Sequence, residues 1–357
     1  MLALTVPASI SGAAGPPPAG FFGIAPQTPL TQLDTRYMAA GGIETVRLPV
    51  SWASMQPTAG GPYQWSGLDE AVAAAARAGL RVFPVVYGTP RWLAPKPTML
   101  PVDSGEQREA WSAFLTALVK RYGPEGEFWA ERAPGVAEDV PAVPNPVPIR
   151  EWQIWNEANF FYFATPISPR LYAQLLRLSH DAIKSVDPLA KIVLSGLFGE
   201  PTAKAPRGMP AAKFLDALYR VPEIKSDFDG IALHPYAVDT EALEELVEAF
   251  HAVTVENHDR VGLYITEMGW GSQDDFNRVA FEQGVGGQVR ELRGAYRYLL
   301  ANRSRLDLKQ VDWFSWKDLP GSCNFCNSVG LFRAGPGLKP KAAWRAFVAL
   351  TGGQPRP

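Results

Sequence analysis

Two apolar segments of this sequence each contain a single glutamate near their end, Glu157 in WQIWNEANF and Glu267 in YITEMGWGS. An isolated carboxylate is unusual in such surroundings, because removing a charge from water is costly unless a partner compensates it. Either residue alone could be a rim carboxylate paired with an arginine. Two of them, 110 residues apart and both following core-like strands, indicate a shared chemical task.

Two carboxyl groups that face each other across a pocket can hydrolyse a glycosidic bond. One is protonated and supplies a proton to the leaving oxygen, while the other is ionised and attacks the anomeric carbon or activates water. Their pKa values must therefore differ, and a nearby cation lowers one of them. Arg47, in ETVRLPV, is the candidate cation for Glu267. At about 4 Å and an effective dielectric near 20, this attraction is worth roughly 4 kcal/mol before desolvation. An ion pair between Arg47 and Glu267 with only a structural role would leave the same pattern in the sequence.

The elements that position these residues alternate along the chain. Short segments rich in β-branched and aromatic residues predict buried strands at residues 21–25, 44–50, 80–87, 149–156, 191–196, 228–234, 262–267 and 311–316. Longer helical patterns occupy residues 68–78, 106–122, 169–186, 211–220, 240–255, 279–302 and 339–350. This alternation predicts an α/β fold, a single-domain (β/α)8 TIM barrel with long loops at the C-terminal face, where such barrels carry their chemistry.

An open, doubly wound sheet is the alternative fold. It is less favoured because no G-x-G-x-x-G sequence opens the first helix and the chain has no Walker A lysine motif. We expect the catalytic barrel to span residues 21–352, followed by a tail at 353–357. The proline-rich residues 123–148 predict a long loop that packs through Phe128 and Trp129.

Strand geometry constrains the first glutamate. Neighbouring residues of a strand point to opposite faces, so Asn156 and Glu157 can enter one pocket only if the strand bends or bulges at its end. We therefore predict a backbone irregularity at this point.

Several motifs resemble glycoside hydrolase clan A, the retaining barrel enzymes. They are WNEAN, ITEMGW, RYGPEGEFWAE, PIREWQIWNEANF and SVGLFRAGPGLKPKAAWRAF, and the last three are most similar to proteins near glycoside hydrolase family 39. The resemblance covers residues 21–350. It implies that Glu157 is the acid/base, that Glu267 is the nucleophile and that Asn156 contacts the sugar 2-hydroxyl. Ala158 departs from the family pattern, in which proline often follows the acid/base; this leaves the roles in place and loosens the subfamily assignment.

The resemblance also implies roles for the sequence His234-Pro235-Tyr236. Tyr236 would orient Glu267, since a phenol that donates to a carboxylate stabilises it and fixes its rotamer. His234 would lie near the sugar or near Glu157. Alternatively, His234 only caps one end of the barrel.

Three tryptophans are candidate sugar contacts, because a broad indole face suits the C–H face of a pyranose. By resemblance, Trp316 forms the floor of the subsite for the cleaved sugar and is followed by a cis peptide bond to Lys317. Trp92 and Trp270 are candidate stacking walls, although packing within buried loops explains them equally well.

Cys323 and Cys326 lie in CNFC, after the eighth predicted strand. A zinc site would need two more ligands, and no His or Cys is nearby in the sequence. A thioredoxin-type role would need the motif at a helix start in another fold. We expect a disulfide that staples the loop, with two reduced thiols as the alternative.

Composition excludes other classes of function. The formal net charge of −2 provides no basic surface for nucleic acid or an anionic membrane, and no segment is long and apolar enough to span a membrane. Four histidines and two cysteines limit metal sites, so we expect no metal and no cofactor. Residues 1–20 begin apolar and then become rich in small residues and proline, which indicates a signal-peptide remnant, and hence export, or a flexible tail.

The sequence thus predicts a retaining β-glycosidase that acts on oligosaccharides or glycosides by double displacement. One alternative is a carbohydrate-binding barrel without turnover; another is a barrel hydrolase or lyase that uses a metal. The sequence leaves open which sugar is bound, whether cleavage is at chain ends or internal, and the oligomeric state.

Overall fold

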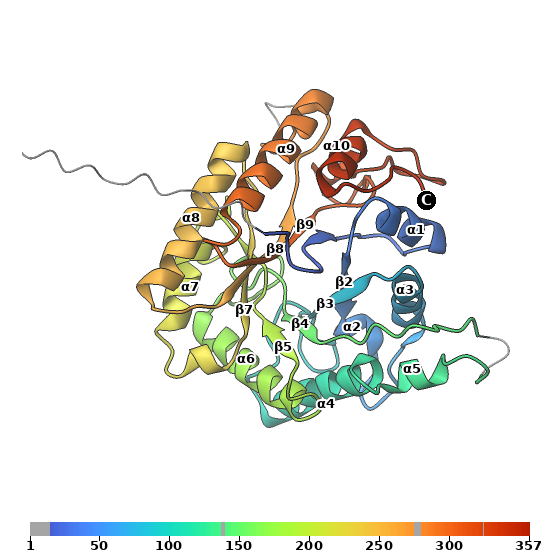
Figure 1. Ribbon diagram of the computed structural model, residues 1–357. Helices are drawn as coiled ribbons and strands as arrows, with labels where there is room; N and C mark the ends of the chain where they lie inside the picture. Colours follow the sequence, from blue (N-terminus) through green and yellow to red (C-terminus); the bar gives the residue numbers. More distant parts are fainter. Residues whose placement is uncertain (1–14, 137–139, 275–279, 324) are drawn as a thin grey trace, which may run out of the picture.

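The computed structural model describes residues 15–136, 140–274, 280–323 and 325–357, and in this part of the chain parallel strands close into a barrel surrounded by helices (Figure 1). The strand segments are β1 (Phe22–Ile24), β2 (Thr45–Ser51), β3 (Arg81–Tyr87), β4 (Glu151–Ile154), β5 (Lys191–Val193), β6 (Leu197–Phe198), β7 (Gly230–His234), β8 (Gly262–Met268) and β9 (Leu308–Trp313). Both β5 and β6 pair with β7, so they are two pieces of one barrel strand, and β1 pairs with β9 to complete the ring. The predicted (β/α)8 barrel is confirmed.

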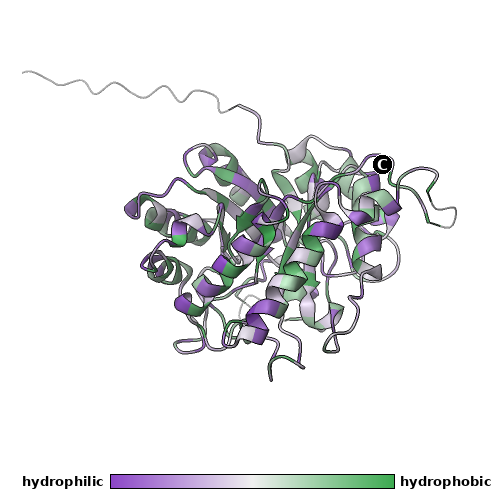
Figure 2. Ribbon diagram, turned by 90° about the horizontal axis from the view of Figure 1, so that it is seen from below, coloured by the Kyte–Doolittle hydropathy of each residue, from purple (hydrophilic) through white to green (hydrophobic). Residues whose placement is uncertain are grey.

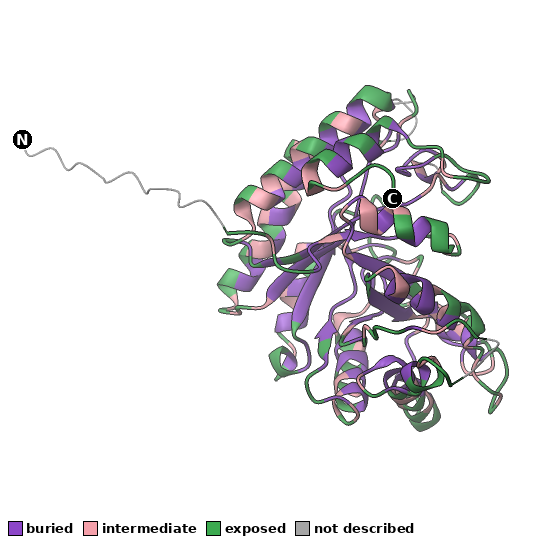
Figure 3. Ribbon diagram, turned by 45° about the vertical axis from the view of Figure 1, so that its right-hand side comes forward, coloured by how far each residue is buried: buried purple, intermediate pink, exposed green. Residues whose placement is uncertain are grey.

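Helices cover the outside of this ring (Figure 1). They are α1 (Gln32–Ala40), α2 (Trp52–Met55), α3 (Ser66–Arg77), α4 (Gly105–Tyr122), α5 (Glu127–Glu131), α6 (Pro169–Lys184), α7 (Ala211–Tyr219), α8 (Thr240–Glu256), α9 (Gly284–Asn302) and α10 (Ala342–Thr351), with short 3-10 helices η1 (Ile224–Ser226) and η2 (Phe325–Asn327). Their inner faces are buried and their outer faces are exposed and hydrophilic (Figures 2 and 3).

The interior of the barrel is layered. Phe83, Val193, Ala232 and Tyr264 form a small buried cluster, with the Phe83 and Tyr264 rings stacked 5.8 Å apart. Further toward the C-terminal ends of the same strands the inward-facing residues become polar. The apolar layer therefore closes the barrel from below and supports the polar groups of the site.

Several boundaries differ from those expected. The last barrel strand spans Leu308–Trp313, so it begins and ends three residues earlier than expected. Its start includes the polar residues Lys309 and Gln310, which hid it in the sequence. Helix α1 was not predicted; it begins with a capping box in which Thr31 and Asp34 bond reciprocally. The segment 123–148 contains α5, and Phe128 and Trp129 are buried, so its predicted packing is confirmed.

Two expectations from the sequence concern residues that lie partly outside the described part of the chain. Residues 1–14 of the N-terminal segment lie outside the described residues, as does residue 279, the expected start of α9. No helix in the described part of the chain is long and apolar enough to cross a membrane.

Candidate active site

The backbone turns sharply where β4 ends, at Ile154. Trp155 and Glu157 have φ values of 68° and 40°, a region that non-glycine residues seldom adopt. The Trp155 ring packs against Trp111 of α4, outside the barrel, while Asn156 and Glu157 both bond to groups at the barrel mouth. The irregularity predicted at this strand end is confirmed.

Glu267 also depends on a strand irregularity. Between Ile265 and Met268, strand β8 advances three residues while β9 advances two, from Val311 to Trp313, which is the signature of a bulge. As a result the adjacent residues Thr266 and Glu267 both make bonds inside the barrel.

Arg47 connects the parts of the site. Its guanidinium is 2% exposed and donates to Glu267 Oε1 at 2.6 Å, to Asn156 Oδ1 at 2.7 Å and to Gln153 Oε1 at 2.7 Å. Bonds of this kind to a charged donor are among the stronger ones in proteins. Arg47 therefore fixes the nucleophile candidate together with two amide side chains, Gln153 of β4 and Asn156 just after it.

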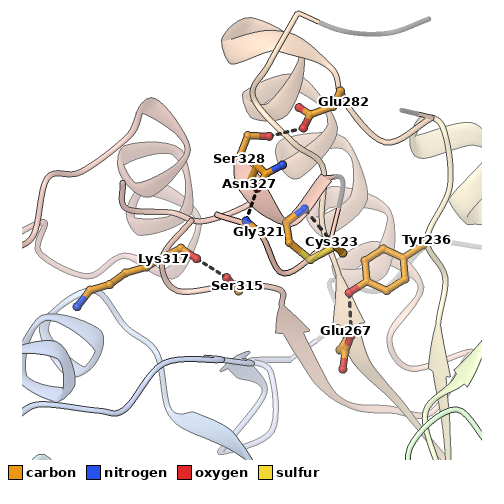
Figure 4. The surroundings of a disulfide bond; sticks show 10 residues. Tyr236, Glu267, Glu282, Ser315, Lys317, Gly321, Cys323, Asn327 and Ser328 are labelled. Atoms are coloured by element: carbon orange, nitrogen blue, oxygen red, sulfur yellow. Dashed lines mark hydrogen bonds between the residues drawn. A yellow bond between two sulfur atoms is a disulfide. The ribbon is translucent and has the colours of Figure 1, made fainter. Parts of the chain in front are cut away.

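The second oxygen of Glu267 is held by Tyr236. The Tyr236 hydroxyl donates to Glu267 Oε2 at 2.8 Å (Figure 4). Burial, together with the negative charge of Glu267, raises the pKa of Tyr236 well above its usual range. The phenol therefore stays protonated and remains a donor to the carboxylate.

His234 holds the other glutamate. Its Nδ1 lies 2.9 Å from Glu157 Oε1, and its Nε2 lies 2.9 Å from Thr266 Oγ1. Burial, with a contribution from the positive charge of Arg47, moves the pKa of His234 well below its usual range. The neutral imidazole thus orients Glu157 without placing a positive charge beside it.

The two glutamates differ in their electrostatic surroundings. Burial raises the pKa of Glu157 well above its usual range, and the negative charge of Glu267 raises it further. The positive charge of Arg47 opposes this rise in the pKa of Glu157. Of the two glutamates, Arg47 donates a hydrogen bond only to Glu267. The arrangement favours a protonated Glu157 beside an ionised Glu267.

Glu157, His234 and Glu267 each bring one potential ligand atom within 4.8 Å of the others. These atoms are already engaged: both Glu267 oxygens accept bonds from Arg47 and Tyr236, and Glu157 bonds to His234. Because the guanidinium supplies the positive charge at this point, the cluster suits a proton-transfer pair better than a divalent cation.

The predicted aromatic contacts are placed differently. Trp316 is fully buried, bonds Asp34 through Nε1 at 2.8 Å and packs on Phe332 and Trp344, so it does not form the floor of a sugar subsite. The expected cis bond after Trp316 is also wrong, since a non-proline cis peptide joins Phe314 to Ser315 instead. The cis bond lies two positions before the expected one, just after a strand that ends three residues earlier than expected.

Of the two other tryptophans, only one is partly accessible. Trp270 is 1% exposed and donates to the Ala237 carbonyl at 2.9 Å, so it packs within the loops. Trp92 is half-buried, donates to the Gln56 carbonyl and meets Trp52 edge-on. Trp92 therefore remains available as a wall near the mouth.

The sequence did not single out three residues of the site, which are Gln153, Thr266 and Phe314. Gln153 links Arg47 to Thr266 through its amide, and Phe314 lies 6.2 Å from the Tyr236 ring. A signal for Gln153 was present, because it is a polar residue inside an otherwise apolar strand, two positions before the irregular strand end.

A cavity of about 400 Å³ lies between the loop after β1, strand β2 and helices α2 and α3. Tyr87, at the end of β3, belongs to its lining, and the pKa of Tyr87 responds to the charges of Arg47 and Glu267 after a larger effect of burial. Arg47, Glu157 and Glu267 are not among the residues that line it.

The structure contains the predicted disulfide between Cys323 and Cys326, with Cα atoms 5.0 Å apart. It lies close to Tyr236 and Glu267 in the loop after β9 (Figure 4). The predicted loop staple is confirmed.

Comparisons with known proteins agree with this architecture. Residues 27–122 match the β-galactosidase family model of glycoside hydrolase family 42, and a β-galactosidase of Thermus thermophilus is 34% identical over 114 residues, covering 25% of this chain and 17% of that protein. A family 39 glycoside hydrolase from Bacteroides cellulosilyticus superposes with a TM-score of 0.66 at 18% identity, covering 94% of this chain and 64% of that one.

Two other solved structures are similar over nearly the whole barrel. A monomeric β-xylosidase from Caulobacter crescentus gives a TM-score of 0.61 at 18% identity, covering 95% of this chain and 69% of that one. The family 53 catalytic domain of Ignisphaera aggregans gives a TM-score of 0.63 at 17% identity, covering 96% of this chain and 99% of that one. The chain thus has the fold of family 39 and other clan A glycoside hydrolases, in agreement with the resemblance of its motifs.

Proposed function

We propose that the protein is a retaining β-glycosidase, with Glu157 as acid/base and Glu267 as nucleophile. The observation that carries this proposal is the short gap between the two carboxyl groups, which bring oxygens within 4.8 Å of each other. Retaining enzymes separate their carboxyls by about 5–5.5 Å, whereas inverting enzymes need about 6.5–9.5 Å to admit a water molecule. The glycosidase names of the similar proteins support the same reaction class.

The first step is glycosylation of the enzyme. Glu157 donates its proton to the glycosidic oxygen as a Glu267 oxygen attacks the anomeric carbon, so the leaving alcohol departs neutral and a glycosyl ester forms. Arg47 and Tyr236 orient the attacking carboxylate. Asn156, which accepts a bond from Arg47, is the proposed contact of the 2-hydroxyl.

The second step releases the sugar. Glu157, now ionised, takes a proton from water as the water oxygen attacks the anomeric carbon, and Glu267 leaves as a carboxylate. His234 keeps Glu157 in place through both steps. The two inversions return the product to its original anomeric configuration.

A panel of aryl β-glycosides tests this function. The wild-type protein should release the aryl alcohol from at least one sugar, and Glu267→Gln should remove that turnover. Turnover that persists in Glu267→Gln contradicts the assigned nucleophile. Sugar binding without turnover by the wild type favours the non-catalytic carbohydrate-binding barrel instead.

We also propose that the protein acts outside the cytoplasm. The Cys323–Cys326 disulfide supports this location, because such bonds persist in oxidising compartments. Fractionation of the native cells, with the oxidation state of these cysteines measured by mass, should find the oxidised protein outside the cytoplasm. Recovery of a reduced, cytoplasmic protein contradicts the proposal.

A further inference from the structure

The disulfide between Cys323 and Cys326 lies at the mouth of the barrel beside Tyr236 (Figure 4). Phe325 lies inside the turn that this bond closes, between the two half-cystines, and its ring is half-buried. The Phe325 and Tyr236 ring centroids are 5.2 Å apart in an edge-on arrangement. The turn thus places an aromatic ring against the phenol that bonds the proposed nucleophile.

Phe325 belongs to a larger group, which we term the aromatic collar and define as Phe198, Phe281, Phe314 and Phe325. All four rings lie within 6.2 Å of the Tyr236 ring centroid, and they come from separate segments of the chain. Phe198, Phe281 and Phe325 keep part of their surface exposed. The collar therefore presents accessible apolar surface around a buried tyrosine.

The turn is fastened unevenly. On its buried side, the Leu319 amide donates to the Cys326 carbonyl at 2.8 Å, and the Ser328 hydroxyl bonds Glu282. On the other side, Cys323 is exposed, its sulfur is bonded to Cys326 and accepts from the Cys326 amide at 3.2 Å, and the preceding Gly321 amide donates to Asn327 at 2.9 Å. A loop this short constrains the unfolded chain little, so the main effect of the disulfide is on the local position of Phe325.

The collar lies next to the proposed nucleophile, the residue that bonds the retained sugar in the proposed reaction. The leaving group departs next to Glu157, which protonates it, whereas the collar surrounds the residue that holds Glu267. Apolar rings bind the C–H faces of a pyranose and offer no hydrogen bond to its hydroxyls.

We propose that the Cys323–Cys326 disulfide positions Phe325 as a wall of the subsite for the retained sugar, the glycone, so that this turn sets which glycone is bound. This inference rests on the proposed glycosidase function. Phe325 is a specificity-determining residue and the disulfide acts through it.

The test compares the oxidised enzyme with enzyme treated with a dithiol. The dithiol becomes a cyclic disulfide, and the protein disulfide takes up two electrons and two protons to give two thiols. Loss of part of the Phe325 contact should raise KM for the preferred aryl glycoside about tenfold. Discrimination among glycones with one leaving group should weaken, while the dependence on leaving group with one glycone should stay the same.

The double variant Cys323→Ser/Cys326→Ser is the matched control. It should show the high KM of the reduced enzyme and should not respond to the dithiol. At the ring itself, Phe325→Ala and Phe325→Leu should raise KM, and Phe325→Trp, which keeps a flat apolar face, should restore it. Melting temperatures of all forms report whether folding is affected.

Binding of pyranose-shaped iminosugars, measured by calorimetry, keeps this test independent of turnover. Unchanged KM, glycone discrimination and iminosugar affinity among the oxidised, reduced and double-serine forms overturn the inference and leave the glycosidase function intact. Failure of every form to hydrolyse any glycoside contradicts the function, while redox-dependent iminosugar binding would still support the wall.

Discussion

A single buried guanidinium separates the roles of the two glutamates. Arg47 lies 2.6 Å from Glu267, while the nearest partner of Glu157 is the neutral ring of His234. Opposite charge favours the ionised form of one carboxyl, and burial favours the neutral form of the other. Two residues of the same type thus suit the two proposed roles, nucleophile and acid, because their neighbours differ.

The loss of activity on replacing Glu157, the proposed acid, should depend on the leaving group. Glu157→Gln cannot donate a proton, so kcat/KM for glycosides of poorly acidic alcohols should fall about 10²- to 10⁴-fold, and much less for dinitrophenyl glycosides. Glu151→Gln, at the start of β4, the strand that precedes Glu157, is the matched control and should retain activity. An equal loss for all leaving groups would contradict the acid role.

The pH dependence of kcat/KM should report the protonation of Glu157. Because the pKa of Glu157 is raised, the protonated, active form persists to higher pH than an ordinary carboxyl allows, and kcat/KM should fall as the pH rises through that pKa. In Glu157→Gln, assayed with a dinitrophenyl glycoside, this alkaline limb should disappear. Its persistence in the variant would assign the limb to another group.

At the scale of elements, both glutamates reach the pocket through departures from regular strand geometry. The positive φ values at Trp155 and Glu157 and the bulge in β8 each turn two adjacent residues inward. The first of these could be predicted, because Asn156 and Glu157 were expected in one pocket. The second could not, since nothing in YITEM distinguishes a bulge from a regular strand.

Close packing of the fifth barrel strand also positions the acid. A Cβ on Gly196 would lie 1.9 Å from His234 Nε2 and 2.5 Å from Thr266 Oγ1. Gly196→Ala should therefore displace the imidazole that holds Glu157 and lower kcat about 100-fold, since small misplacements in a site can cost this much. Steady-state kinetics with a poor leaving group measures the effect.

Gly199→Ala provides the comparison for this substitution. Its new Cβ would meet the Leu246 side chain at 3.0 Å and the His234 carbonyl oxygen at 3.4 Å, an ordinary contact, and would not press on the imidazole, so kcat should change little. Equal losses in the two variants would show that the effect at Gly196 arises from general packing.

The sequence predicted the order of strands and helices and the meeting of Glu157, Glu267 and Arg47 at one place, because each rests on a strong local pattern. It failed for Trp316, where a tryptophan near a strand end resembled the family pattern. The structure places Phe314 beside Tyr236 and buries Trp316 behind it, against Trp344. A shift of three residues at one strand boundary was enough to exchange a site residue for a core residue.

At the scale of the whole molecule, the barrel interior also contains an acid that is not part of the pair. Asp312, on β9, is fully buried and accepts bonds from Gln310. Burial raises its pKa to about 8. The folded protein therefore keeps a proton on Asp312 that the unfolded chain loses at a much lower pH.

This difference predicts how stability depends on pH. Between about pH 4 and pH 8 the folded state binds one more proton at Asp312 than the unfolded state, so this residue makes stability fall by roughly 1.4 kcal/mol per pH unit. Asp312→Asn removes the titration, and its stability relative to wild type should rise across this window. Denaturant unfolding at pH 5 and pH 8 measures both; parallel pH dependences would contradict the raised pKa.

The convergence of two glutamates on one sugar can be tested most directly by trapping the glycosyl-enzyme. A 2-deoxy-2-fluoro glycoside with a dinitrophenyl leaving group should add one fluorosugar to the intact protein, and peptide mapping should locate it on Glu267. A label on any other residue, or release of a product with inverted anomeric configuration from an ordinary substrate, would contradict the account.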